Sequence, residues 1–187
     1  MEFYSVTDGY IDYLSSVHTH VYSNKEITRK NPRKYLGVVF ENNGYKYFIP
    51  LSSPKKGDFV QNSQGVKEIR KDTYLIFRIV SHEKDGDELK GTLRIANMIP
   101  VPESELLIYD VNDESDVDYK NLVLKEQEYV RKNSEKIISR AKNVYNKHKC
   151  GNTEKIMELC LDYTDLERMH DEWKKLITDS DEGSKQS

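Results

Sequence analysis

The sequence lacks the features that build a disulfide scaffold or a membrane span. Its 187 residues include only two cysteines, Cys150 and Cys160, so we expect reduced thiols rather than disulfides. No stretch approaches the roughly 18 apolar residues of a membrane-spanning helix, and residues 1–24 have neither the basic start nor the unbroken apolar core of a signal peptide. These absences predict a cytoplasmic protein that does not associate with membranes.

Motifs for metal binding and for common hydrolases are missing as well. His18 and His20 form the only close histidine pair, and there is no H-E-x-x-H or C-x-x-C pattern. The chain also has no G-x-S-x-G motif and no phosphate-binding G-x-x-x-x-G-K-[ST] motif. We therefore expect a site that uses no metal and no cofactor.

Charge is present but segregated along the chain, although the formal net charge is only −3. Residues 25–60 hold eight Lys/Arg and three Asp/Glu, and residues 119–149 hold nine and three. Residues 81–118 and 150–187 are acidic. Two basic segments in an acidic chain indicate a local site for a polyanion, or else two solvated faces whose counter-charges fold alongside.

Alternation of apolar residues predicts a curved antiparallel sheet or barrel in the first part of the chain. The turn signal Asn42-Asn43-Gly44 joins two of the expected strands into a hairpin. The polar segment 55–72 reads as a mobile loop, or as a loop with a short ordered piece, and from residue 57 onward it is expected to become ordered when a ligand is bound. The strands are expected at residues 3–6, 35–41, 45–51, 74–81 and 89–95, with a proline-broken edge strand at 97–102.

Helical periodicity is expected at 9–19 and from residue 119 onward. Tyr10, Ile11, Tyr13, Leu14 and Val17 form the apolar face of the first helix, while Val123, Val130, Ile137 and Val144 recur every seven residues in the second helix or helix pair.

The capping-box sequence 164–167 predicts the start of a last helix that buries Leu166, Met169, Trp173 and Leu176 or Ile177. We expect one α+β domain over residues 1–177, with a β core at about 1–110, a helical part at about 118–177 and a disordered tail at 178–187.

The stretch Pro50–Lys56, with the sequence PLSSPKK, stands at the end of an expected strand. Pro54 fixes its own φ and favours an extended backbone at Ser53. Lysines beside a rigid hydroxyl suit a phosphodiester, because they neutralise charge that builds on the phosphate. RNA supplies its own nucleophile, the 2′-OH, so Ser53 and Lys55 with Arg33 and Lys34 could cleave it without metal. The alternative is a basic surface turn without chemistry.

This turn is one of several matches, in order, to a single family. The matches are Phe3-Tyr4, Tyr10-Ile11, Tyr13-Leu14, Asn31-Pro32, Gly37-Val38-Val39, Tyr45-Lys46-Tyr47, the 50–56 turn, Met98-Ile99-Pro100, Tyr119-Lys120, Gln127, Arg131, Asn133-Ser134 and Lys136-Ile137. From residue 3 to about residue 176 the chain resembles the endoribonuclease toxins of type III toxin–antitoxin systems, the ToxN-, AbiQ- and CptN-like family.

The resemblance implies a partly open antiparallel SH3-like β-barrel of the MazF/Kid kind, with an N-terminal helix and appended C-terminal helices. It implies a metal-independent endoribonuclease that cleaves single-stranded RNA by 2′-OH transesterification, leaving 2′,3′-cyclic phosphate and 5′-OH ends. It further implies a repeat-derived pseudoknot antitoxin RNA that the toxin processes and that inhibits it in a closed protein–RNA hetero-oligomer, and a role in abortive infection against phage. The alternative is a non-catalytic RNA-binding protein that captures structured RNA repeats.

Residue by residue, the resemblance implies a catalytic set of Ser53, Lys55, Arg33, Ser52 and Tyr10. Two positions depart from the family pattern: Arg33 replaces a lysine, and Arg29 replaces a tyrosine. Arginine does not readily release a proton. If the family's lysine transfers a proton in the reaction, Lys34 or Lys55 must therefore do so in this chain.

Basic side chains outside the catalytic set are candidate contacts to RNA phosphates, or by default solvating charge. They are Arg29, Lys30, Lys34, Lys56, Lys120, Arg131, Lys132, Lys136 and Arg140. The aromatic residues Tyr22, Tyr35 and Phe59, near the first basic segment, are candidates to stack on unpaired bases.

Overall fold

The computed structural model describes residues 1–24, 33–152 and 154–183. It contains nine strands and three α-helices in these ranges, an α+β architecture as the sequence predicts. In chain order they are β1 (Glu2–Val6), α1 (Asp8–Val17), β2 (Tyr35–Asn42), β3 (Tyr45–Ser52), β4 (Phe59–Gln61), β5 (Lys67–Ile69), β6 (Ile76–Glu83), β7 (Gly86–Arg94), β8 (Ile99–Pro100), β9 (Leu106–Ile108), α2 (Val117–Lys149) and α3 (Tyr163–Gly183).

Seven strands form one antiparallel sheet in the order β6-β7-β3-β2-β1-β9, and β8 also pairs with β3. The predicted β2–β3 hairpin is confirmed: Asn43 and Gly44 have φ of 50° and 83°, as a tight hairpin turn requires. Within the described ranges no pairing joins β6 to β9, so the sheet is not a closed barrel.

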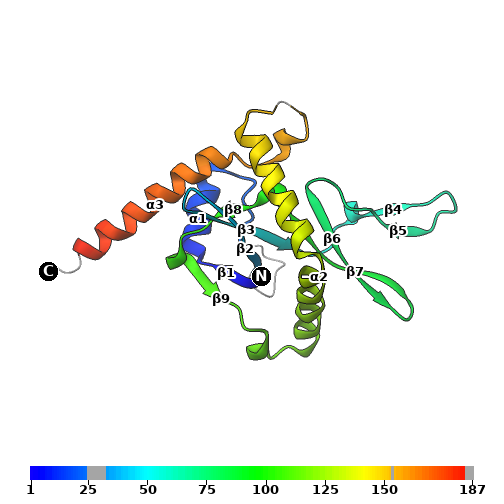
Figure 1. Ribbon diagram of the computed structural model, residues 1–187. Helices are drawn as coiled ribbons and strands as arrows, with labels where there is room; N and C mark the ends of the chain where they lie inside the picture. Colours follow the sequence, from blue (N-terminus) through cyan, green and yellow to red (C-terminus); the bar gives the residue numbers. More distant parts are fainter. Residues whose placement is uncertain (25–32, 153, 184–187) are drawn as a thin grey trace.

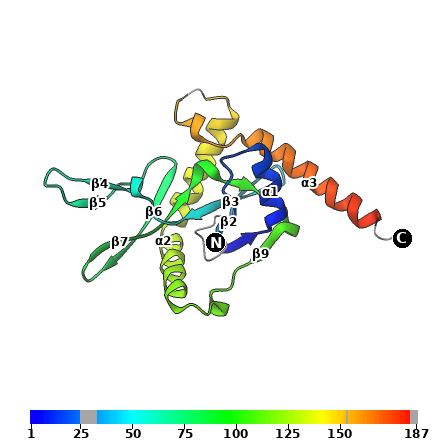
Figure 2. The ribbon, with the colours of Figure 1, turned by 180° about the vertical axis from the view of Figure 1, so that it is seen from behind.

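The segment predicted as a mobile loop contains the short hairpin β4–β5 (the arm). Phe59 pairs with Ile69, and Gln61 pairs with Lys67. Figures 1 and 2 show the arm and the β6–β7 hairpin projecting from one side of the molecule, while α3 extends on the opposite side. The segment is therefore a short hairpin and not a mobile loop, as the alternative of a short ordered piece allowed. Arg70 N donates to Asp58 O at 2.9 Å and closes the base of the arm.

Helix α2 is one continuous helix that crosses the sheet (Figure 1). The predicted stripe of Val123, Val130, Ile137 and Val144 is buried along its whole length. The Asp116 side chain accepts from Tyr119 N and caps the start of the helix. Gly151, two residues after the end of the helix, has a φ of +68°, the left-handed conformation that glycine adopts readily at helix ends.

A buried carboxylate ties the sheet to both long helices. Glu167 of α3 accepts hydrogen bonds from Tyr47 of β3 at 2.8 Å and from Tyr145 of α2 at 2.7 Å. Its second oxygen accepts from Lys149 at 2.7 Å. Burial and the neighbouring Glu167 carboxylate raise the pKa of the Tyr47 hydroxyl, so this tyrosine acts as a hydrogen-bond donor.

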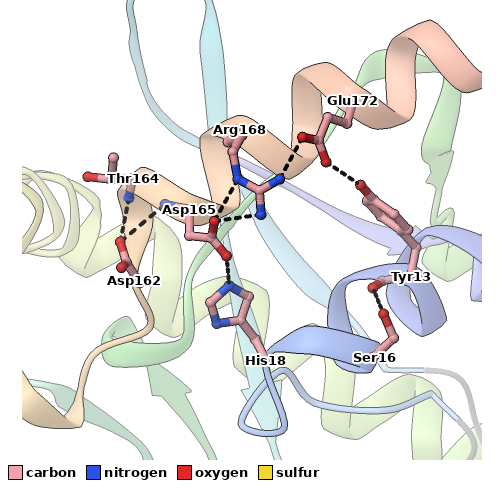
Figure 3. A network of polar contacts seen from close by, with 8 residues as sticks. All are labelled: Tyr13, Ser16, His18, Asp162, Thr164, Asp165, Arg168 and Glu172. Carbon is pink, nitrogen blue, oxygen red and sulfur yellow. Dashed lines mark hydrogen bonds and ion pairs between the residues drawn. The ribbon is translucent and has the colours of Figure 1, made fainter.

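Helices α1 and α3 are joined by the polar network in Figure 3. His18 Nε2 lies 2.8 Å from Asp165 Oδ2, and Tyr13 Oη donates to Glu172 at 3.1 Å. Arg168 bridges Asp165 and Glu172. The predicted apolar face of α1 holds for its central residues, but the helix ends at residue 17, where Val17 is 56% exposed.

The last helix differs from its prediction at both ends. Asp162 Oδ1 accepts from the backbone N of Thr164 and Asp165, so Asp162 caps the helix. The predicted capping box is wrong because Glu167 is engaged with the two buried tyrosines. The helix continues to Gly183, although a disordered tail was predicted from residue 178, and Leu176 is exposed. None of the helices in the described part of the chain is long and apolar enough to cross a membrane.

Candidate active site

The predicted turn leaves the sheet at the end of β3. Leu51 and Ser52 pair with Leu93 and Thr92 of β7, and Thr92 Oγ1 donates to Ser52 O at 3.3 Å. Ser52 is 4% exposed, whereas Ser53 is exposed. The exposed hydroxyl of Ser53 therefore follows directly on a buried, hydrogen-bonded strand, which limits its movement.

One aromatic ring brings two of the predicted catalytic cations together. The centre of the Tyr22 ring lies 4.3 Å from the Arg33 guanidinium carbon and 5.4 Å from Lys55 Nζ. Arg33 is 1% exposed and donates from Nη1 to Leu51 O at 2.8 Å, one residue before the serine pair. Arg33 and Lys55 thus lie beside the turn that carries both serines.

A buried carboxylate that sequence reasoning missed anchors the lysine turn. Asp58 is 2% exposed and pairs with Arg78 Nη2 at 3.1 Å and Arg94 Nη2 at 3.2 Å. Its Oδ2 accepts from Lys55 N at 3.0 Å, and its own N donates to Lys55 O at 2.9 Å. One carboxylate faces two guanidiniums, so this group (the Asp58 node, with Arg78 and Arg94) carries net positive charge beside Lys55.

Lys34 follows Arg33 in the chain but does not join the Tyr22 cluster. Its ammonium lies 3.6 Å from the centre of the Tyr109 ring, and burial lowers the pKa of Lys34. The two neighbouring side chains thus contact different aromatic rings, Tyr22 for Arg33 and Tyr109 for Lys34. Of the two lysines predicted to transfer the proton, Lys55 is therefore the one that lies at the turn.

A second buried carboxylate lies on the α2 side of the sheet. Glu126 packs over Gly91, where a Cβ would come within 2.5 Å of Glu126 Oε1 and 3.4 Å of Ser52 O. Burial raises the pKa of Glu126 to about 8. Sequence reasoning missed this residue, although it stands three positions after Val123, on the same helix face.

Tyr10 is not brought to the turn. Its side chain is 0% exposed, and its hydroxyl donates to Pro100 O at 2.8 Å. The ring packs at a steep angle on Trp173 of α3, with centroids 5.6 Å apart. In this structure Tyr10 is a core residue, and a catalytic role for it stays a prediction.

The basic residues of α2 divide between surfaces. Lys136 and Arg140 lie over Phe77 of β6, with 5.6 Å and 4.1 Å to its ring centre. Lys132, one turn earlier, pairs with Glu128. The exposed Arg131 lines a hollow that is also lined by residues of β1 and β9.

Two further cations complete the predicted set. Lys120 donates to Asn112 O at 3.1 Å, and Lys56 is exposed at the turn. Arg29 and Lys30 lie outside the described residues.

The site can bind an anion and stabilise developing negative charge. The buried guanidinium of Arg33, the exposed ammonium of Lys55 and the exposed residue Ser53 lie on neighbouring segments. The Asp58 node, which carries net positive charge, is hydrogen-bonded to the backbone of Lys55. Cations fixed in a partly dry site stabilise a phosphoryl transition state more than they would in water. In residues 1–24, 33–152 and 154–183, no three His, Cys, Asp or Glu side chains gather to hold a metal ion.

Comparison with known proteins gives one consistent relationship. The family model described as toxin ToxN of type III toxin–antitoxin systems matches residues 2–171. An endoribonuclease ToxN from Pectobacterium atrosepticum is 28% identical over 183 residues, covering 98% of this chain and 99% of the relative.

Two solved structures are similar over most of their length. One is AbiQ, a lactococcal anti-phage endoribonuclease of a type III system, with a TM-score of 0.74, 28% identity and coverage of 93% of this chain and 98% of AbiQ. The other is a type III toxin studied for selective inhibition by a non-coding RNA pseudoknot, with a TM-score of 0.74, 27% identity and coverage of 92% and 97%. With a family model that spans nearly all of it, this chain belongs to the ToxN family of endoribonuclease toxins from type III toxin–antitoxin systems.

Proposed function

We propose that this endoribonuclease cleaves single-stranded RNA by metal-independent transesterification at the 50–56 turn. The observation that carries the proposal is the convergence of Arg33 and Lys55 on the Tyr22 ring, next to the exposed Ser53. Two cations supply the charge stabilisation that a metal ion supplies in other nucleases.

In the proposed reaction the RNA 2′-oxygen attacks the adjacent phosphorus and the bond to the 5′-oxygen breaks. The products are a 2′,3′-cyclic phosphate and a 5′-hydroxyl. Arg33 stays protonated and stabilises the negative charge that develops on the phosphate. Ser53 orients the phosphate or the 2′-hydroxyl, whose proton passes to water. Lys55 donates the proton that the leaving 5′-oxygen needs and then regains a proton from water. Ser52 supports the turn from its buried position.

The biological partners follow from the family. We infer that a repeat-derived pseudoknot RNA is both processed by this toxin and its inhibitor, in a closed protein–RNA assembly. A similar toxin is inhibited by a non-coding RNA pseudoknot, and a second similar structure is described with a processed non-coding RNA that regulates an antiviral system. We infer action in the cytoplasm and in defence against phage, since the similar AbiQ is an anti-phage enzyme.

The finer architecture is also a proposal. We propose that the strongly paired strands β1–β3 and β6–β9 correspond to a partly open SH3-like barrel. Residues 1–177 would form one toxin domain, with the helices appended to its β core.

The experiment that tests this function compares wild type with Ser53→Ala on a mixed RNA pool in EDTA. We expect cyclic phosphate ends from wild type and none from the variant. Intact RNA with wild type, together with retained RNA binding, would favour the second candidate, a non-catalytic protein that captures RNA repeats. The basic residues of α2 support binding in either case.

A further inference from the structure

A hollow of about 480 Å³ lies between the proposed catalytic turn and the β4–β5 arm. Its lining residues are Pro54, Lys55, Lys56, Phe59, Val60, Gln61 and Lys67. Lys55 belongs both to this hollow and to the Tyr22 cluster. The hollow therefore begins beside the position proposed for the scissile phosphate.

The hollow contains the one candidate stacking residue that remains suitable for a base. Tyr35 is 1% exposed and packed in the core. The Tyr22 ring is contacted by Arg33 and Lys55, two cations of the proposed catalytic site, whereas the cation over the Phe59 ring, Lys67, belongs to an exposed side chain of the arm. Phe59 is half-buried in the wall of the hollow. Lys67 Nζ lies 3.9 Å from the centre of its ring. An aromatic surface beside ammonium groups is the combination with which proteins bind unpaired nucleotides.

The two walls of the hollow are fixed relative to each other before any ligand arrives. Asp58 binds Lys55 N on the side of the turn, and its carbonyl accepts from Arg70 N at the base of the arm. Its carboxylate is held in turn by Arg78 and Arg94. A preformed site loses little affinity to the ordering of its own segments.

We propose that this hollow is the subsite for the nucleoside that flanks the scissile phosphate. Phe59 stacks on the base, and Lys56 and Lys67 contact the neighbouring phosphates. The exposed Gln61 carries an amide that both donates and accepts hydrogen bonds, which suits it to distinguish base edges. The proposal rests on the endoribonuclease function given above and assigns the choice of cleavage sequence to the β4–β5 arm.

The test compares wild type with Phe59→Ala, Phe59→Tyr and Val66→Ala on a randomised RNA pool, with 5′ ends mapped by sequencing. Val66 is the matched control, because it is an apolar residue of the arm that is 55% exposed and does not line the hollow. We expect Phe59→Ala to lose base preference at one position beside the cut and to cleave preferred sites about tenfold or more slowly, the usual effect of one lost base stack. Phe59→Tyr and Val66→Ala should keep the wild-type preference.

A binding measurement separates failure of the subsite from failure of the proposed function. Short 2′-deoxy oligonucleotides lack the nucleophile, so their affinities are measurable whether or not the protein cuts RNA. A base-dependent loss of affinity in Phe59→Ala supports the subsite even if wild type is inactive. Equal or absent binding of these oligonucleotides by wild type and Phe59→Ala would overturn it, as would an unchanged cleavage preference or a uniform slowing at all sequences.

Discussion

Replacing Asp58 by Asn tests whether one carboxylate holds the catalytic turn. The variant keeps the shape of the side chain but leaves Arg78 and Arg94 facing each other without a counter-charge. Removing one partner of a buried ion pair costs about 3–5 kcal/mol. For a chain of this length each kcal/mol lowers Tm by about 2–4 °C, so the expected loss is roughly 6–20 °C.

Thermal unfolding by circular dichroism measures this loss, and Glu103→Gln is its control. Glu103 also pairs with a cation, Lys46, but its side chain is 75% exposed, so no measurable change in Tm is expected. The double variant Asp58→Asn/Arg94→Gln should be more stable than the sum of the single effects predicts, because it removes surplus positive charge. A Tm for Asp58→Asn within about 2 °C of the wild-type Tm would refute the reasoning, because the smallest expected loss is roughly 6 °C.

Two more predictions concern α2. Burial raises the pKa of Glu126 from 4.5 to about 8, so the stability that the protonated Glu126 contributes is fully present below pH 4.5 and is lost as pH rises toward 8. In pH-dependent melting, Glu126→Gln should remove up to about 5 kcal/mol of this loss, and parallel curves for both proteins would contradict it. Lys136→Ala should weaken RNA binding and lower the slope of log affinity against log salt by about 1, whereas Lys175→Ala, an exposed lysine of α3, should change neither. An unchanged slope in Lys136→Ala would show that this lysine contacts no phosphate.

Short-range patterns predicted the elements that frame the site. The Asn43-Gly44 turn fixes the β2–β3 hairpin within a few residues, and the valine and isoleucine stripe of α2 repeats along a single helix. The end of β3 at Ser52 follows from the same local signals. Because the turn continues directly from that strand, its place at the end of β3 was predictable.

Long-range pairing accounts for what the sequence did not show. Asp58 looked like one charge in a polar loop, but its partners Arg78 and Arg94 are 20 and 36 residues away. The burial of Glu126 depends on the packing of α2 over Gly91, a residue 35 positions earlier in the chain. In the same way, the core position of Tyr10 depends on contacts with Pro100 and Trp173, which no local pattern encodes.

The measurement that tests the central claim most directly is cleavage of a mixed RNA pool by wild type and Ser53→Ala in EDTA, with the ends identified chemically. The account predicts 2′,3′-cyclic phosphate and 5′-hydroxyl ends from wild type alone, with Ser53→Ala folded and still able to bind RNA. Cleavage by Ser53→Ala at the wild-type rate, or wild-type activity that disappears in EDTA and returns with a divalent metal, would contradict it.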